Sequence, residues 1–181
     1  MNKNWSIKML TEAGVMIALA FILGKIRLFE MPQGGAITVG QMIPLIIFSM
    51  RYGLLPGLFV CGLFGLVEMI FDWAIFHPIQ ALLDYPIAYM SLGLCGIFSN
   101  QFKKTGSIKP VICGTFLGVF VRFLCHVLSG VIFFSSYAPE GQNPIIYSLT
   151  YNGSYLFVES MLSIFIIFLL RNFIRKDLRR L

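Results

Sequence analysis

Long apolar runs separated by short polar stretches dominate the pattern of this chain. A membrane-spanning helix needs about 20 mostly apolar residues, and six segments approach that length. They run from about Leu10 to Lys25, Ile37 to Met50, Leu54 to Ile75, Ile79 to Phe98, Val111 to Phe134, and Ile146 to Leu170. The second segment is short and contains Pro44, so we expect a helix that is tilted or broken at that proline.

The composition is typical of a protein that lies in lipid. Hydrophobic residues make up 57% of the 181 residues and charged residues only 12%, whereas a soluble domain carries about a quarter charged residues. No small-residue cleavage site follows the basic start of the chain, which favours a retained first helix. We therefore predict an all-α integral membrane protein, with residues 1–181 forming a single six-helix membrane domain.

The basic residues predict the orientation of this domain. Eleven of the fourteen fall at ends that an even number of crossings places on one side of the membrane. They are Lys3, Lys8, Arg51, Lys103, Lys104, Lys109, Arg171, Arg175, Lys176, Arg179 and Arg180. By the positive-inside rule both termini are then cytoplasmic. The net charge of +6 is also compatible with nucleic-acid binding, but the placement at helix ends favours membrane orientation, and we expect no nucleic-acid partner.

Three connections then lie outside, at residues 29–36, 72–78 and 137–144. The first is rich in Gly and Pro and is expected to be a shaped loop. The four cysteines, at 61, 95, 113 and 125, lack Cys-x-x-Cys or histidine spacing for a metal. We expect them to be small packing residues rather than metal ligands.

An aspartate inside an apolar segment is the feature that most needs a reason, because charges are costly in a bilayer. Asp84 and its neighbour Tyr85 lie near the outer end of the fourth segment. One interpretation is a solvated carboxylate at a helix start, favoured by the helix dipole. The other is a carboxylate that faces a cavity open to the outside and pairs with a cationic ligand.

A second polar face is predicted on the fifth segment. Arg122 and His126 are four residues apart and therefore lie on one side of a helix, which Ser129 continues. An arginine exposed to lipid would be expensive, so this side should face the interior. Arg122 then contacts a ligand or pairs with a carboxylate such as Glu68 or Glu159, and the sequence leaves both open.

The sixth segment begins with a stripe of tyrosines. Tyr147, Tyr151 and Tyr155 recur every four residues, which is typical of an aromatic belt at the membrane interface. Asn152 does not fit that interpretation. Its amide offers two donors and an acceptor, which suit the edge of a heterocycle.

The first segment carries a small-xxx-small pair, Gly14 and Ala18, that would let another helix approach closely. The partner is either a helix of this chain or one of another subunit. The sequence contains neither a Walker-type phosphate loop nor a His-Glu-x-x-His motif. We therefore expect no nucleotide hydrolysis, no metal site and no enzymatic activity.

Several motifs appear in order along the chain and together carry a resemblance to a known family. They are Thr11–Ala18, Met31–Gly35, Pro44 through Gly53, His77–Tyr85, Ser91–Gly93, His126–Phe134, Tyr137-Ala138 and Tyr147–Asn152. Over nearly its whole length the chain resembles the thiamine-specific substrate-binding subunit of energy-coupling-factor vitamin transporters. The resemblance implies six membrane helices with cytoplasmic termini in a bacterial cell membrane. It implies capture of thiamine from outside, without a cofactor, and work with two ATP-hydrolysing subunits and a transmembrane coupling subunit.

The same resemblance implies roles for individual residues. Substrate-binding positions fall on Asp84, Tyr85, Arg122, His126, Gly130, Phe134, Tyr147 and Asn152. The family motif that contacts the coupling subunit falls on Gly14 and Ala18. The family often has Glu where Asp84 stands, and some relatives have Trp where Phe134 stands, which implies weaker stacking here.

Three other functions remain as alternatives. The same architecture could bind another vitamin, such as riboflavin or a pyridoxine-like compound. The chain could be a self-contained channel or carrier that needs no ATP-hydrolysing partner. A membrane enzyme is the third alternative, although the sequence shows no hydrolase motif beyond the neighbouring His126 and Ser129.

Overall fold

The structure is a computed structural model that describes residues 5–71 and 75–178. Within these ranges, five helices are long and apolar enough to cross a membrane. They are α1 (Ile7–Lys25), α3 (Leu54–Phe71), the continuous helix Pro78–Thr105, α7 (Lys109–Phe133) and α8 (Pro144–Leu178). A sixth, α2 (Met42–Tyr52), is shorter. The predicted all-α membrane fold is confirmed. Lys3, Asp72, Trp73, Arg179 and Arg180 lie outside the described residues.

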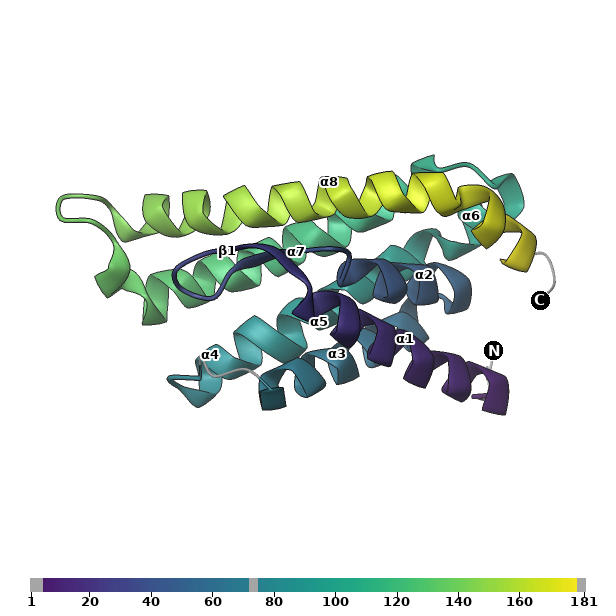
Figure 1. Ribbon diagram of the computed structural model, residues 1–181, viewed down its shortest axis with the longest axis horizontal. Helices are drawn as coiled ribbons and strands as arrows, with labels where there is room; N and C mark the ends of the chain where they lie inside the picture. The colour runs from purple at the N-terminus through teal and green to yellow at the C-terminus, as the bar shows by residue number, and fades with distance from the viewer. Residues whose placement is uncertain (1–4, 72–74, 179–181) are drawn as a thin grey trace.

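The helices run side by side along the long axis of the molecule (Figure 1). The start of α1, the end of α8 and α6 (Ser99–Thr105) lie at one end. The connection between α7 and α8, which contains η3 (Ser135–Tyr137), and α4 (Pro78–Leu82) lie at the other. This arrangement agrees with the charge pattern, because the basic ends of the segments gather at the first end.

The second apolar segment differs from its prediction. Residues 36–38 form strand β2 (Ala36–Thr38), which pairs antiparallel with β1 (Arg27–Glu30), so the expected external loop is a β-hairpin. Pro44 does not break α2, because it occupies the first turn, where a backbone N–H has no helical partner. The 11 residues of α2 span only about 16 Å at 1.5 Å per residue. The hairpin and a cavity occupy the remaining depth.

The fourth helix is continuous but irregular. After α4 it widens into a π turn, η1 (Leu83–Ile87), continues through α5 (Ala88–Met90), and tightens into the 3₁₀ helix η2 (Ser91–Phe98) before α6. Pro86 explains the wide turn, since it lacks an N–H and its ring would collide with the carbonyl four residues earlier. π turns are common at functional sites, and this one carries Asp84.

The helix extends seven residues beyond its predicted end at Phe98, through the polar α6 (Ser99–Thr105). It ends where Gly106 adopts a left-handed conformation (φ 62°) and donates to the carbonyl of Phe102. Glycine adopts this C-terminal conformation without the steric cost that a side chain would add.

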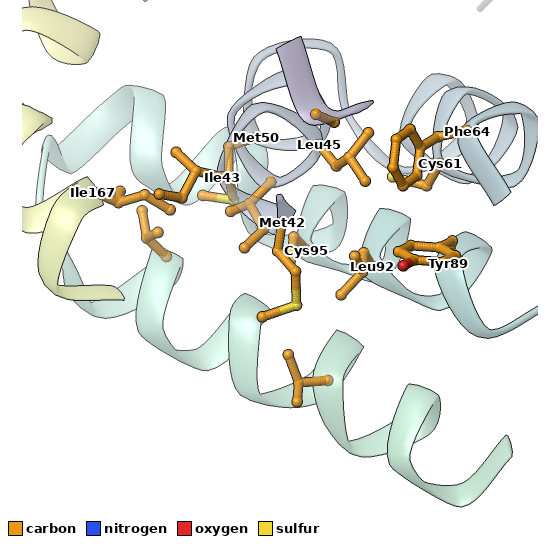
Figure 2. Packing of buried hydrophobic residues seen from close by; sticks show 14 of the residues in the cluster. Met42, Ile43, Leu45, Met50, Cys61, Phe64, Tyr89, Leu92, Cys95 and Ile167 are labelled. Atoms are coloured by element: carbon orange, nitrogen blue, oxygen red, sulfur yellow. The ribbon is translucent and has the colours of Figure 1, made fainter. Parts of the chain in front are cut away.

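The core forms around α2, which other helices surround on nearly all sides. In Figure 2, Leu45 of α2 lies beside Cys61 and Phe64 of α3, close to Tyr89 and Leu92 of the fourth helix. Cys61 and Cys95 are buried here, as predicted for packing residues, whereas Cys113 is exposed and Cys125 is partly exposed. Because α2 does not face lipid, it need not match the thickness of the bilayer.

Candidate functional site

A cavity of about 150 Å³ lies beneath the β-hairpin, at the N-terminal end of α2. Its walls come from the end of α1, the hairpin, the π turn, α7 and α8. Every residue predicted to bind substrate lines this cavity. These residues are Asp84, Tyr85, Arg122, His126, Gly130, Phe134, Tyr147 and Asn152. The helices thus bring together side chains that lie up to 68 positions apart in the sequence.

Asp84 is held by three side chains and is not a solvated carboxylate at a helix start. Its Oδ2 accepts hydrogen bonds from Ser129 Oγ at 2.8 Å and from Gln80 Nε2 at 2.7 Å. Its Oδ1 lies 3.1 Å from Nδ1 of His126. The side chain is only 16% exposed. His126 and Ser129 do not hydrogen-bond to each other, because both contact the carboxylate of Asp84.

The partners of His126 define its protonation. Arg122 donates from Nε to Nε2 of His126 at 3.2 Å. An arginine nitrogen can only donate, so Nε2 must carry a lone pair and the proton lies on Nδ1. His126 is therefore assigned as a neutral ring that donates to Asp84 and accepts from Arg122.

The charges around the cavity pair off, with one exception. Lys25 lies 3.5 Å from Glu68, and Arg27 pairs with Glu30 within the hairpin. Arg122 lies 3.9 Å from Glu159, which settles the choice between Glu68 and Glu159 that the sequence left open. Asp84 has no lysine or arginine within ion-pair distance in the described part of the chain.

Aromatic rings form much of the remaining wall. Tyr85 is 7% exposed, and Tyr89 lies under the guanidinium of Arg122, 4.2 Å from ring centre to Cζ. Phe134 ends the α7 side of the cavity and packs edge-on against Phe76, 5.5 Å between ring centres. The cavity therefore combines an anion with several flat apolar faces.

The β-hairpin is fastened to α8 by the tyrosine stripe. The backbone N–H of Gln33 donates to Tyr151 Oη at 2.9 Å, and Tyr147 Oη donates to the side chain of Gln33 at 3.2 Å. A Cβ on Gly35 would lie 2.7 Å from the ring of Tyr155, so only glycine lets the hairpin rest there. The interpretation of this stripe as an interfacial belt is wrong, because it faces the cavity and the hairpin.

Asn152 and Gly130 have structural partners within the protein. The Asn152 amide donates to the Ser148 carbonyl at 2.9 Å, and its oxygen accepts from Tyr155 at 3.2 Å. A Cβ on Gly130 would overlap the hydroxyl of Ser148. Gly130 therefore permits the close approach of α7 and α8 beside the cavity.

Several cavity residues were missed by sequence reasoning. Gln33, Gln41 and Gln80 are uncharged, so nothing in the apolar pattern marked them. Glu159 lies outside the cavity wall and was considered only as an ion-pair partner, yet the four-residue spacing of Tyr147, Tyr151 and Tyr155 continues directly to it. That spacing was the signal that could have placed Glu159 on the same face of α8.

The predicted partner-binding pair lies apart from this cavity. Gly14 and Ala18 are exposed on the outer side of α1. Apart from its chain neighbours and the backbone of its own helix, no atom of the described residues lies within 4 Å of where a Cβ on Gly14 would stand. The pair therefore does not pack against a helix inside the described chain, and its surface is exposed.

Comparisons with known proteins agree on one family. Residues 10–178 match the family described as "Thiamine transporter protein". The thiamine transporter ThiT of Bacillus subtilis (strain 168) is 37% identical over 166 residues, covering 86% of each chain. ThiT of Lacticaseibacillus paracasei is 28% identical over 178 residues, covering 92% of this chain and 88% of the relative.

A solved structure of ThiT from Listeria monocytogenes has the same fold, with a TM-score of 0.87 at 26% identity. The match covers 97% of this chain and 98% of that one. Membrane-spanning helices and this kinship together indicate a multi-pass protein of the bacterial cell membrane. The sequence match over residues 10–178 and the shared fold lead to one conclusion: the chain belongs to the thiamine transporter protein family.

Proposed function

We propose that this protein is a thiamine-binding membrane subunit that captures the vitamin from outside the cell. The observation that carries the proposal is the unbalanced carboxylate of Asp84. Its partners are neutral donors, while the other acidic groups around the cavity each have a basic partner. Thiamine carries a permanently cationic thiazolium ring, which would restore the charge balance of the cavity.

The walls of the cavity suit the remainder of such a ligand. Tyr85 and Phe134 offer flat faces, and a cation over an aromatic ring gains about 0.5–2 kcal/mol. The aminopyrimidine ring has donors and acceptors on its edge, which Asp84, Tyr147 and Asn152 can read after modest rearrangement of their present hydrogen bonds. A site built from such polar groups rejects analogues that leave them unpaired.

The direction of capture is supported by the position of the cavity. It lies beneath the hairpin that joins α1 to α2, away from the end where α1 begins and α8 ends. The positive-inside rule assigns the end where α1 begins and α8 ends to the cytoplasm. A ligand would therefore enter from the external side, past or through the hairpin.

Transport would require partner subunits. The sequence carries no phosphate-binding loop for ATP hydrolysis, so ATP-driven uptake would depend on other subunits. The family resemblance implies two ATP-hydrolysing subunits and a transmembrane coupling subunit in that role. The exposed Gly14 and Ala18 provide a close-approach surface for the coupling subunit. In this scheme thiamine is cargo: the protein needs no cofactor and returns the vitamin chemically unchanged.

Calorimetry on the purified chain in detergent tests the proposal. Thiamine should bind saturably at one site, and riboflavin, which has no fixed cation, should not compete. Saturable riboflavin binding without thiamine binding would support the alternative vitamin. No binding of either would remove the proposed function.

Vesicles test the partner requirement. Those that contain this chain alone should bind thiamine but not accumulate it. Accumulation without ATP and partner subunits would indicate a self-contained carrier. Recovery of an altered vitamin after incubation would indicate an enzyme.

A further inference from the structure

A buried carboxylate outside the cavity connects the hairpin to the ligand-facing side chains. Glu159 is 1% exposed, and its Oε1 accepts a hydrogen bond from Thr38 Oγ1 at 2.6 Å. Its Oε2 lies 3.9 Å from Nη1 of Arg122, which is itself only 5% exposed. One carboxylate thus contacts the last residue of strand β2 and the arginine that holds His126.

These contacts belong to a closed ring of interactions. The Thr38 hydroxyl has a single proton, which goes to Glu159, and its lone pair accepts from the backbone N–H of Gln41 at 3.0 Å. The Gln41 side chain accepts from Tyr89 Oη at 2.9 Å. The Tyr89 ring lies under Arg122, which returns to Glu159. The ring therefore joins the hairpin, the start of α2, the fourth helix, α7 and α8.

The energetic cost of a buried charge explains why Glu159 should influence the position of its neighbours. A buried ion is tolerated only when it is paired and hydrogen-bonded, and removing one partner leaves the other charge unpaired. Nη1 of Arg122 has no hydrogen bond within the described residues, and Glu159 is the carboxylate that lies within ion-pair distance of it. The guanidinium is also held by His126 and by the Tyr89 ring, so Glu159 adds the charge partner to these contacts. Arg122 in turn fixes His126, and His126 donates to Asp84.

We propose that Glu159 is a positioning residue of the thiamine site, which acts through Thr38 on the hairpin and through Arg122 on His126 and Asp84. Glu159 does not line the cavity, so it would act on the ligand through its neighbours. It holds the hairpin and the cavity wall in the arrangement that retains a bound cation. The inference rests on the proposed function, because its effect is measured on bound thiamine.

Two variants test separately the contact of Glu159 with Arg122 and its hydrogen bond with Thr38. In Glu159→Gln an amide replaces the charge that faces Arg122, although the oxygen can still accept from Thr38. Thr38→Val keeps the side-chain shape and removes only the hydroxyl. The matched control is Ser163→Ala, one turn further along the same side of α8, where a fully buried hydroxyl has no hydrogen bond in the described chain.

The measurement is the rate at which labelled thiamine leaves the purified chain after an excess of unlabelled thiamine is added. Glu159→Gln and Thr38→Val should each accelerate dissociation about tenfold, equivalent to about 1.4 kcal/mol. Association should change by less than about threefold, since most affinity differences within one site lie in the off-rate. Ser163→Ala should match the native rate.

Hydrogen exchange gives a second readout that general destabilisation would not localise. In the thiamine-bound state, amides of residues 27–38 should exchange faster in both variants than in the native chain and in Ser163→Ala. Amides of α3 should be unaffected.

Each outcome is decisive. Native dissociation rates in folded Glu159→Gln overturn the inference while the proposed function stands, because the native chain still binds thiamine. If Glu159→Gln does not fold, an unchanged rate in Thr38→Val overturns it. A native chain that binds no thiamine overturns both proposals.

Discussion

Asp84 and His126 lie 42 positions apart in the chain and meet at 3.1 Å, oxygen to Nδ1, across the gap between the fourth helix and α7. The histidine in this pair is a neutral donor, because Arg122 donates to its other ring nitrogen. The carboxylate is therefore stabilised by hydrogen bonds, and no cationic side chain of the described residues pairs with it to neutralise its charge. Such a group is poised to attract a cation while remaining tolerable in a largely buried position.

Asp84→Asn should weaken thiamine binding by more than about tenfold, or about 1.4 kcal/mol. The change removes the charge, and in either orientation the amide nitrogen would face a donor, either His126 or the pair Ser129 and Gln80. Calorimetry measures the affinity, with Glu140→Gln as a control because Glu140 is an exposed acid in the α7–α8 connection. Native affinity in Asp84→Asn would show that the carboxylate is not the charge partner.

Tyr151→Phe should speed the release of thiamine by about fivefold, because one net hydrogen bond is worth about 1 kcal/mol. The hydroxyl accepts from the backbone of Gln33 and so holds the hairpin tip to α8. Ser154→Ala removes a hydroxyl from the exposed side of the same helix and should leave release unchanged. Equal release rates for all three proteins would mean that this hydrogen bond does not retain the ligand.

Gly130→Ala should destabilise the protein by about 1–3 kcal/mol, the usual cost of overfilling a packed site. The added methyl group would overlap the Ser148 hydroxyl, so that either this side chain rotates and loses its hydrogen bond to the Val127 carbonyl or α8 shifts away from α7. Gly14→Ala is the matched control, since open space surrounds that position and alanine favours a helix by about 1 kcal/mol. Thermal unfolding in detergent should therefore show a lower Tm for Gly130→Ala and a higher Tm for Gly14→Ala than for the native protein. Similar shifts for both would argue against close packing at Gly130.

Gly14→Trp should abolish assembly with the coupling subunit while thiamine binding stays native. The bulky ring would prevent close approach of another helix at an exposed position remote from the cavity. Co-purification measures assembly, and calorimetry measures binding. Phe120→Trp places the same ring on the exposed side of α7 and should assemble normally. Assembly of Gly14→Trp would remove this surface as the docking site.

The apolar pattern predicted the number and approximate bounds of the helices because each crossing must bury about the same length of chain. It failed for α2. The run from Ile37 to Met50 is mostly apolar, yet its first residues form a strand, because β1 supplies backbone partners and the helix is surrounded by protein. Apolar character records burial, and burial alone does not distinguish a strand from a helix.

The candidate site was predicted best where a charge had to be explained. Asp84, Arg122 and His126 stood out because lipid would penalise them, and all three line the cavity. Gln33 and Gln41 carry no such penalty and could be placed only by the fold. The neutral form of His126 likewise depends on the geometry of Arg122, which no spacing along a single helix fixes.

The number of residues in the π turn at Leu83–Ile87 decides how the side chains before and after it are oriented around the ligand cavity. One residue more or fewer in a helical turn rotates everything before it by about 100° relative to everything after it. Shortening this turn by one residue would swing Gln80 and the preceding loop around the helix axis while Tyr89 stayed in the core. The direction in which Asp84 faces thus depends on the number of residues in the turn as well as on their identity. An insertion or deletion here should be tolerated less well than most substitutions.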